Sequence, residues 1–155
     1  MLDITFEKAT VDDVKTIIGV KNASFYEDYI KHGESRGYNN PIEGITRTVQ
    51  NNIVYKIQSH GNMIGYISVT QKSDSDFYLN CLCVVPAYEN QGIGQMAMTF
   101  LEKQFSQAKH WSLEALADKK RNIYFYQKHG YQITKEYMDG NVKIVLFEKW
   151  SNIPV

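Results

Sequence analysis

The feature that most restricts the fold of this chain is an apolar strand followed by a glycine turn and a helix. Residues 77–85 form a near-continuous apolar run, the pattern of a strand buried on both faces, and Pro86 ends it. After six residues, Gly92-Ile93-Gly94 opens a segment with apolar residues at helical spacing. These apolar residues are Ile93, Met96, Ala97, Phe100, Leu101 and Phe105. The pattern predicts a buried strand that leads through a turn into an amphipathic helix.

The rest of the chain alternates strand and helix signals in a mixed order. Thr10-x-x-Asp13 resembles a capping box, with aspartate in the usual glutamate position, and opens a first helix. Residues 24–40 are polar and aromatic, and the pattern assigns them no structure, whereas Gly61-Asn62 indicates a hairpin turn. The expected strands are residues 2–8, 53–57, 63–69, 77–85, 111–116, 131–137 and 142–148, and the later helices are about 41–50, 92–105 and 120–128. The order βααβββαβαββ predicts a mixed α/β fold in a single domain over residues 1–155.

Composition and charge exclude several classes of protein. Lysine plus arginine equals aspartate plus glutamate at 17 each, which counts against a general nucleic-acid binder. No run approaches the ~20 apolar residues that span a bilayer, and residues 1–4 lack a signal-peptide pattern. Cys81 and Cys83 are two apart on one strand, which suits neither a disulfide nor, without further ligands, a metal site. We therefore expect a cytoplasmic protein with no metal, nucleic acid or membrane partner, in which both cysteines are core residues.

Glycines at the start of a helix favour a phosphate ligand, because the backbone can approach closely and the unpaired N–H groups and helix dipole attract an anion. A P-loop is excluded, since no Gly-Lys-Ser/Thr follows. A dinucleotide fingerprint fits better, because residues 92–97 match Gly-x-Gly-x-x-Gly/Ala and Glu114 lies where a ribose-binding acid would be. However, residues 86–91 separate the strand from the first glycine, and the chain leaves no room for a second nucleotide-binding half. The dinucleotide hypothesis is therefore disfavoured.

The same segment resembles the acetyl-CoA signature of the GNAT superfamily. In that signature an apolar strand, Val-x-Pro and an aromatic residue precede Gln/Arg-x-x-Gly-x-Gly/Ala and a helix; here these are Val84-Val85-Pro86, Tyr88 and residues 89–94. Glu89 departs from the family's glutamine or arginine, but the backbone nest of residues 91–95 does not need that side chain. Strand order and length match the superfamily from end to end. The resemblance implies a mostly antiparallel, twisted sheet of six to seven strands flanked by about four helices.

A second match is independent of the glycines. Leu113-Glu114 on a strand, followed by residues 122–131, is similar to the family's Leu-Glu strand and Tyr-Glu-Lys-x-Gly-Phe/Tyr helix end. The resemblance implies acetyl-CoA as cosubstrate, no metal, and a strand that binds the pantetheine arm through its backbone. Asn122 either donates a hydrogen bond to the cofactor or caps the helix expected over residues 120–128. The cofactor-binding residues implied are Leu82, Cys83, Val84, Asn90, Gln91, Gly92, Ile93, Gly94, Gln95, Asn122 and Tyr126.

Two residues are candidates for proton transfer. An attacking amine must be neutral, although alkyl amines have pKa values near ~10, so a base or a water chain must remove a proton. Glu114 matches the acidic residue that has this role in some family members, with positioning of the acceptor as the alternative. Tyr126 matches the family's tyrosine that protonates the departing thiolate, and the alternative is a core aromatic.

The acceptor is the least defined part of the prediction. Tyr26, Tyr29 and Tyr38, with nearby acids, fall in the segment that lines the acceptor pocket in this superfamily, and aromatic and acidic groups suit a cationic amine. Residues 25–38 look like a mobile lid long enough to fold over a compact ligand. We therefore expect an N-acetyltransferase that acts on a small-molecule amine by direct attack, with a homodimer left open. The alternatives are a non-catalytic acyl-CoA sensor and an enzyme acting on a protein or peptide N-terminus.

Overall fold

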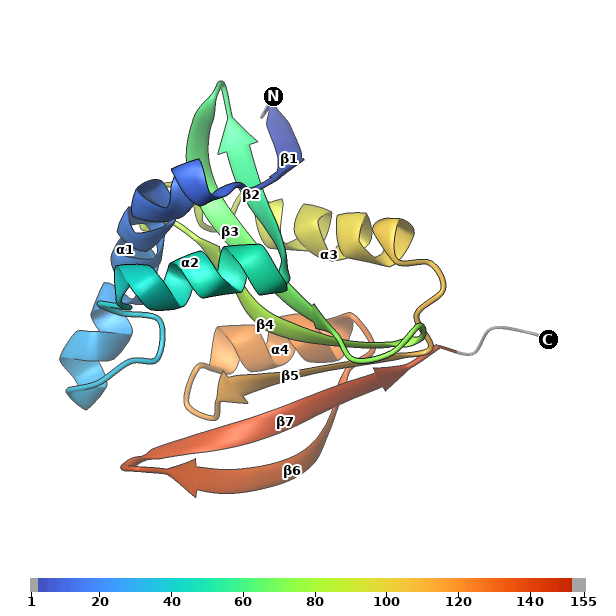
Figure 1. Cartoon of the computed structure of the whole chain (residues 1–155). Helices are drawn as coiled ribbons and strands as arrows, with labels where there is room; N and C mark the ends of the chain where they lie inside the picture. Colours follow the sequence, from blue (N-terminus) through green and yellow to red (C-terminus); the bar gives the residue numbers. More distant parts are fainter. Residues whose placement is uncertain (1–2, 152–155) are drawn as a thin grey trace. The chain divides into compact units, whose positions relative to one another are not determined.

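The computed structural model describes residues 3–151, which contain seven strands and four α-helices (Figure 1). The strands pair in the order β1-β2-β3-β4-β5-β7-β6. The predicted mixed α/β class and the order βααβββαβαββ are confirmed; Leu2, placed in the first strand, lies outside the described residues. The strands are β1 (Ile4–Lys8), β2 (Ile53–Ser59), β3 (Asn62–Gln71), β4 (Asp76–Val84), β5 (His110–Leu116), β6 (Gln132–Asp139) and β7 (Val142–Trp150). The helices are α1 (Val14–His32), α2 (Ile42–Asn51), α3 (Ile93–Gln104) and α4 (Lys120–Lys128).

The chain forms two compact units. The first unit comprises Met1–Val69 and Cys81–Phe105, and the second comprises Thr70–Asn80 and Ser106–Val155. That a single domain spans residues 1–155 stays a prediction. Within residues 3–151 no helix is both long and apolar enough to cross a membrane.

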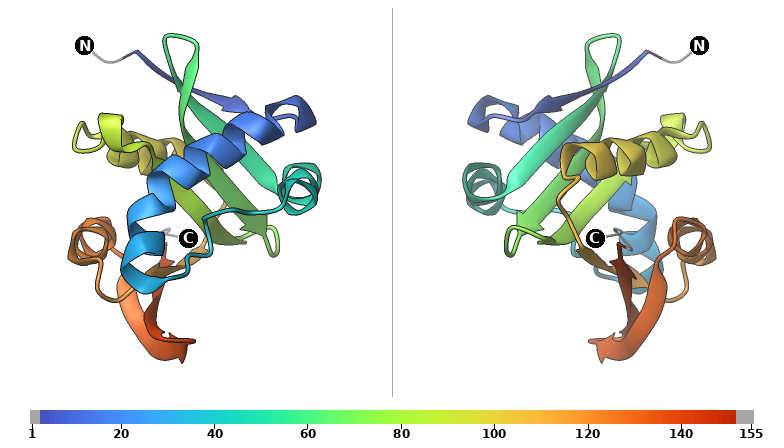
Figure 2. Two further views of the ribbon diagram at one scale, coloured as in Figure 1. Left: turned by 90° about the vertical axis from the view of Figure 1, so that its left-hand side faces the viewer. Right: turned by 90° about the vertical axis from the view of Figure 1, so that its right-hand side faces the viewer.

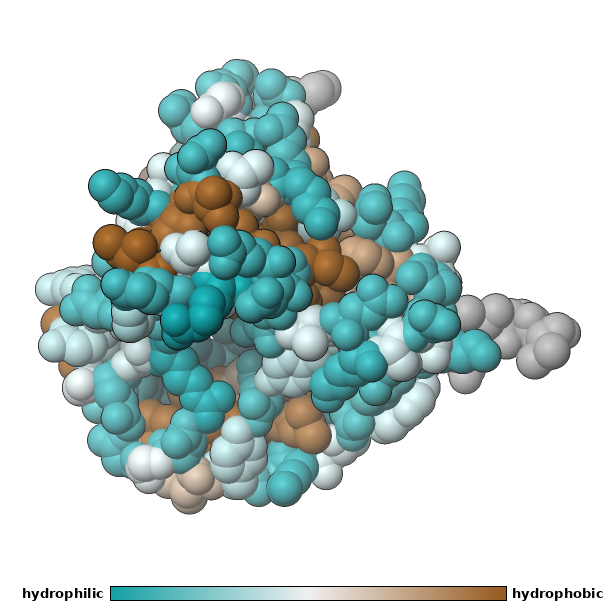
Figure 3. Space-filling model, viewed as in Figure 1, coloured by the Kyte–Doolittle hydropathy of each residue, from teal (hydrophilic) through white to brown (hydrophobic). Residues whose placement is uncertain are grey.

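In the first unit, helices cover both faces of the strands. On one face α1 and α2 pack on Val54 and Tyr66, while on the other Phe100 of α3 stacks on Phe6 at 4.6 Å and meets the edge of Tyr55 at 4.9 Å. Neighbouring residues of a strand point to opposite faces, so Val54 and Tyr55 mark the two sides. The two views of Figure 2 show α1 before the strands from one side and α3 from the other. The α1–α2 face carries brown apolar patches among polar side chains in Figure 3.

The β2–β3 hairpin of the first unit turns one residue earlier than predicted. Ser59 pairs with Asn62, so the turn residues are His60 and Gly61, with φ of 51° and 81°. Two consecutive residues with positive φ make the tight turn whose twist matches a hairpin. Asn62 therefore belongs to β3 and not to the turn.

In the second unit, one helix covers one face of the strands. The first residues of β4, Asp76–Leu79, pair in parallel with β5, and β5 and β6 each pair antiparallel with β7. Tyr126 of α4 packs on Phe147 with ring centroids 5.6 Å apart. Helix α4 has the predicted bounds and ends before Gly130, which has φ of 90° as expected after a helix.

The expectation that residues 77–85 are buried on both faces is wrong. In β4 Phe77 and Leu79 are buried, but Tyr78 between them is half-buried and Asn80 is exposed. Only alternate side chains therefore face the core of the second unit. The opposite side carries polar groups, which the apolar composition of the run concealed.

The predicted mobile lid is mostly helix. α1 continues to His32 and ends at Gly33, whose N–H donates to the Tyr29 carbonyl at 2.8 Å. In the loop that follows, Tyr38 stacks on Tyr29 with centroids 4.5 Å apart. A Cβ on Gly37 would collide with the Phe25 ring, so the loop packs closely on the helix. The segment is therefore a helix end with a packed return loop.

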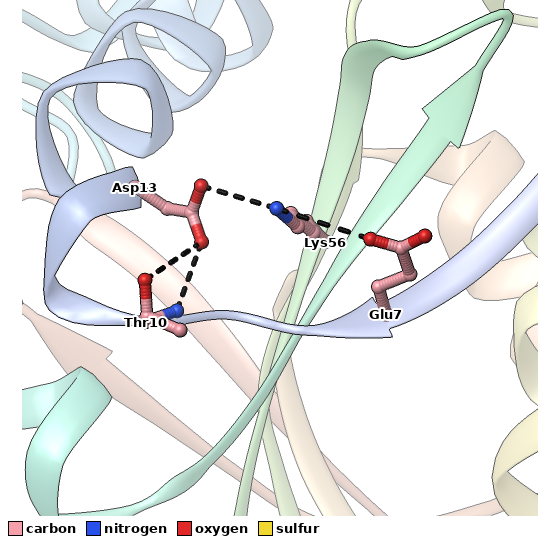
Figure 4. A network of polar contacts seen from close by, with 4 residues as sticks. All are labelled: Glu7, Thr10, Asp13 and Lys56. Atoms are coloured by element: carbon pink, nitrogen blue, oxygen red, sulfur yellow. Dashed lines mark hydrogen bonds and ion pairs between the residues drawn. The ribbon is translucent and has the colours of Figure 1, made fainter.

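The start of α1 is tied to β2 by a small polar network (Figure 4). As the capping-box pattern predicts, the Thr10 N–H donates to the Asp13 carboxylate at 2.8 Å. The Lys56 Nζ lies 3.2 Å from Asp13 Oδ1 and 4.0 Å from Glu7 Oε2. Burial raises the pKa of Asp13, but the Thr10 N–H and the Lys56 ammonium outweigh it and hold that pKa below its ordinary value. The ionised carboxylate thus stabilises the fold.

We expect Asp13→Asn to lower the free energy of unfolding by about 1 kcal/mol at pH 7, because it removes the charged acceptor of the cap. A group with a depressed folded pKa stabilises fully above its unfolded pKa of ~3.9, so the difference between wild type and variant should be lost as the pH falls through the lowered pKa of the folded state. Denaturant unfolding at several pH values measures it, with the exposed neighbour Asp12→Asn as control. Equal losses in both variants at every pH would contradict the network's role.

Candidate active site

The glycine turn of the first unit presents the amino end of α3. Asn90 and Gly92 both have left-handed backbone conformations, with φ of 63° and 79°. Gly92 is the N-cap of α3 and makes no side-chain cap. The first N–H groups of a helix lack intrahelical acceptors, and the helix dipole makes this end attractive to an anion. A Cβ on Gly92 would meet nothing within 4 Å, so the backbone angle, not crowding, requires glycine there.

The last residues of β4 precede this turn and are held by β3. The Val85 N–H donates to the Ile64 carbonyl at 2.9 Å. A Cβ on Gly65 would lie 2.6 Å from the Cys83 carbonyl oxygen, so the two backbones approach more closely than a side chain allows. The parallel pairing of β4 with β5 ends at Leu79. Leu82, Cys83 and Val84 are therefore held along β3.

Both cysteines are free thiols in the first unit, Cys83 buried and Cys81 half-buried. They pack with α1 in the core, as the sequence predicts. A hydrogen bond with Cys81, together with burial, raises the pKa of the Cys83 thiol well above its ordinary value. The thiolate is the nucleophilic form of cysteine. Cys83 is therefore unsuited to forming an acyl-enzyme.

In the second unit Glu114 accepts hydrogen bonds from two tyrosines. The Tyr78 hydroxyl donates to Oε1 at 3.0 Å, and the Tyr137 hydroxyl donates to Oε2. The three side chains come from β4, β5 and β6, and all are half-buried. Sequence reasoning identified Glu114 but missed Tyr78 and Tyr137, because their separations of 36 and 23 residues leave no local signal.

Tyr126 lies on the opposite face of the same sheet. Glu114 pairs with Leu146 and Leu113 pairs with Phe147, so Phe147 and Glu114 point to opposite sides. Because the Tyr126 ring packs on Phe147 and Tyr131, it belongs to the face without Glu114. Tyr126 is the buried residue of α4. The sequence match thus selects a residue that the helix directs inward.

The remaining predicted residues divide between the two units. Tyr26 and Tyr29 of α1 both contact Tyr38, with centroids 6.0 and 4.5 Å apart, so the acceptor candidates form one cluster in the first unit. Asn122 lies in the first turn of α4, whose N-cap is Lys119, so the helix-capping alternative for Asn122 is wrong. The residues predicted to bind the cofactor in the first unit are Leu82, Cys83, Val84, Asn90, Gln91, Gly92, Ile93, Gly94 and Gln95.

His110 forms a polar network that the sequence did not suggest. Its Nδ1 lies 2.7 Å from Asp76 Oδ1 and its Nε2 lies 2.9 Å from Glu148 Oε1. The Thr134 hydroxyl lowers the pKa of Glu148, burial opposes this, and His110 lowers it further, so the carboxylate form is favoured. The network ties β4, β5 and β7 together at the start of β5. In the part of the chain that the structure describes, no three His, Cys, Asp or Glu side chains are grouped to hold a metal ion.

Comparison with known families agrees with this architecture. Residues 50–133, more than half of the chain, match the acetyltransferase (GNAT) domain family. The chain therefore belongs to the GNAT acetyltransferase family, and the sequence predictions of the family, the fold class and the enzyme class are confirmed. Among curated proteins, none matches the sequence significantly.

Several solved structures have the same fold at low sequence identity. The PaiA N-acetyltransferase of Thermoplasma acidophilum, in complex with coenzyme A, has a TM-score of 0.82 and 19% identity, over 96% of this chain and 99% of that one. The ribosomal-protein-S18-alanine N-acetyltransferase of Escherichia coli has a TM-score of 0.80 and 14% identity, over 99% and 97%. A GNAT family acetyltransferase of Elizabethkingia anophelis with acetyl-CoA bound has a TM-score of 0.66 and 15% identity, over 96% and 98%.

Proposed function

We propose that this GNAT acetyltransferase transfers the acetyl group of acetyl-CoA to a primary amine of a small molecule, by direct attack. The observation that carries the acetyl-CoA part is the amino end of α3, where the N-cap residue Gly92 takes a left-handed conformation and has no side chain to cap the helix. The coenzyme A and acetyl-CoA in the structures from T. acidophilum and E. anophelis support the same cosubstrate.

The residues of the glycine turn fit the pyrophosphate of coenzyme A. The N–H groups from Gln91 to Gln95 lie at a helix start, where backbone donors and the dipole both favour an anion. The space beside Gly92 is open, so a ligand atom can approach the backbone. We assign the pantetheine arm to the backbone of Leu82–Val84, which β3 holds in place, and a supporting hydrogen bond to Asn122.

Glu114 is the base in this proposal. It takes a proton from the amine, directly or through water, while the nitrogen bonds to the acetyl carbon. The hydroxyls of Tyr78 and Tyr137 each donate to a different carboxylate oxygen, which supports a fixed orientation of Glu114. A base whose orientation is fixed by hydrogen bonds needs less reorganisation when the amine binds. We assign the two tyrosines as positioning residues.

Tyr126 is the acid. As the carbon–sulfur bond breaks, its phenol donates a proton to the coenzyme A thiolate. The packing of the Tyr126 ring on Phe147 and Tyr131 supports a fixed position of this phenol. The buried, neutral thiol of Cys83 supports direct transfer without an acyl-cysteine.

The acceptor is proposed to be a small amine because of the tyrosine cluster of α1 and its return loop. Tyr26 is 52% exposed and Tyr29 38% exposed, although both contact Tyr38. Exposed aromatic rings beside Glu27 and Asp28 suit a cationic group. The net charge of zero supplies no field that would steer a highly charged macromolecule.

The test is the release of thiol from acetyl-CoA across amino acids, polyamines, aminoglycosides and peptides. We expect turnover with at least one small amine and less with peptides. A Gly94→Trp variant, which places a bulky ring at the start of α3, should lose coenzyme A binding by calorimetry, whereas Gly19→Trp, at an exposed position of α1, should not. Turnover on peptides alone would refute the small acceptor, and binding without any turnover would indicate an acyl-CoA sensor.

Replacing Tyr126 by Phe should lower kcat about 10²–10⁴-fold, the usual contribution of a general acid, because the thiolate then leaves without a proton donor. The affinity for acetyl-CoA should change little, since the ring and its packing are kept. Steady-state kinetics and calorimetry measure the two effects, and Tyr124→Phe on the same helix, which is 67% exposed, is the control. A decrease in kcat of less than tenfold would show that Tyr126 contributes packing and not proton transfer.

Replacing Glu114 by Gln should lower kcat at least a hundredfold, because an amide cannot take the proton of the amine. Tyr137→Phe should keep the Glu114 carboxylate but remove one of the two tyrosine hydrogen bonds that orient it, so we expect kcat to fall about tenfold. The lost activity of Glu114→Gln should recover partly at high pH, where more of the amine is already neutral. An unchanged pH–rate profile in Glu114→Gln would show that another group is the base.

A further inference from the structure

Lys21 is a charged residue inside the first unit. It lies on α1, is 8% exposed, and belongs to the few buried polar residues of the described chain. Burying an ammonium group without an opposite charge is costly, so buried lysines are normally paired. The ion pairs of lysine in the described residues involve others, such as Lys56 with Asp13 and Lys143 with Glu136, and no carboxylate lies within ion-pair distance of Lys21.

The two titratable groups that the structure places near the Lys21 ammonium, Tyr66 and Cys83, are neutral. The Lys21 Nζ lies 5.2 Å from the centre of the Tyr66 ring, a cation–π contact that offsets part of the cost. A hydrogen bond with Cys81 and burial raise the pKa of the Cys83 thiol, and the positive charge of Lys21 opposes this rise. The Ser24 hydroxyl donates to the Val20 carbonyl at 2.8 Å. Burial raises the pKa of Tyr66, so this phenol and the Cys83 thiol both stay neutral. Among residues 3–151, the site therefore has a cation and an aromatic face, with no carboxylate in ion-pair contact.

The position of Lys21 indicates what would supply the anion. Cys83 belongs to the strand segment Leu82–Val84, to which we assign the pantetheine arm. Lys21 lies on α1, the helix that also carries Tyr26 and Tyr29 of the tyrosine cluster assigned to the acceptor. A carboxylate, which carries one negative charge, would neutralise the one positive charge of this ammonium group.

We propose that Lys21 binds a carboxylate of the acceptor, so that the substrate is an amine that also carries a carboxylate, as an amino acid does. The proposal rests on the acetyl transfer proposed above and defines the acceptor further. The carboxylate completes the ion pair that the fold leaves open, while the amine remains free to attack the acetyl group. Recognition of this kind rejects a neutral analogue, because the buried cation would then stay unpaired.

The test compares the common α-amino acids with their α-carboxamides in wild type and in Lys21→Met. Methionine keeps most of the apolar stem and removes the charge. In wild type the carboxylate form of the best acceptor should be preferred, and Lys21→Met should lower its kcat/KM about 10–100-fold while leaving the carboxamide unchanged. Lys15→Met, an exposed position of the same helix, should change neither.

Two further measurements separate this role from a structural one. Calorimetry with coenzyme A should show the same affinity in wild type and Lys21→Met, and the melting temperature of the variant should be unchanged or higher, since an unpaired buried charge has been removed. Calorimetric titration of the amino acids and carboxamides into the coenzyme A complex measures the preference even where turnover is slow. Equal binding of both forms to wild type, or an equal loss of both in Lys21→Met, would overturn the proposal. Failure of acetyl transfer to every amine, with the carboxylate preference still present in binding, would instead overturn only the proposed reaction.

Discussion

The close approach of β3 to the Cys83 carbonyl is the constraint on which the proposed cofactor site depends. Gly65 permits it, because any larger residue would place a Cβ 2.6 Å from that oxygen. With β4 held there, the chain leaves the strand at Val85, whose N–H is bonded to Ile64, and enters the turn that begins α3. The positions of the helix start and of the strand backbone are thus coupled through one glycine that lies outside the signature sequence. A substitution at Gly65 would disturb the site without touching any residue assigned to bind the cofactor.

The parts of the fold that the sequence predicted best have strong local signals. Helix α4 could be bounded correctly because Gly130 follows it and apolar residues recur within it. The end of α1 could not be predicted, since Tyr26, Tyr29 and Ile30 are large apolar residues that the helix leaves exposed, which blurs the periodic pattern. The apolar composition of β4 likewise concealed the polar face that begins at Tyr78.

The candidate site could be predicted only where a residue carries its own motif. Glu114 and Tyr126 stand at positions that the family resemblance defines, so the sequence was enough to choose them. Tyr78, Tyr137 and Lys21 are selected by tertiary contacts and burial, which depend on how strands and helices far apart in the chain come together. No local pattern distinguishes Lys21 from the exposed lysines of the same helix.

The His110 network also bears on the order in which the protein can form during its synthesis. Its partners lie 34 residues before and 38 residues after His110, so the ring can meet Asp76 well before Glu148 has been made. The first unit, by contrast, uses no residue beyond Phe105 and has its whole chain available earlier. Compact units generally fold once their whole chain has been synthesised. We therefore expect the first unit to fold on the ribosome before β7, the pairing partner of β5, has been synthesised. The strand that completes the second unit is thus the last part of the described fold to be translated.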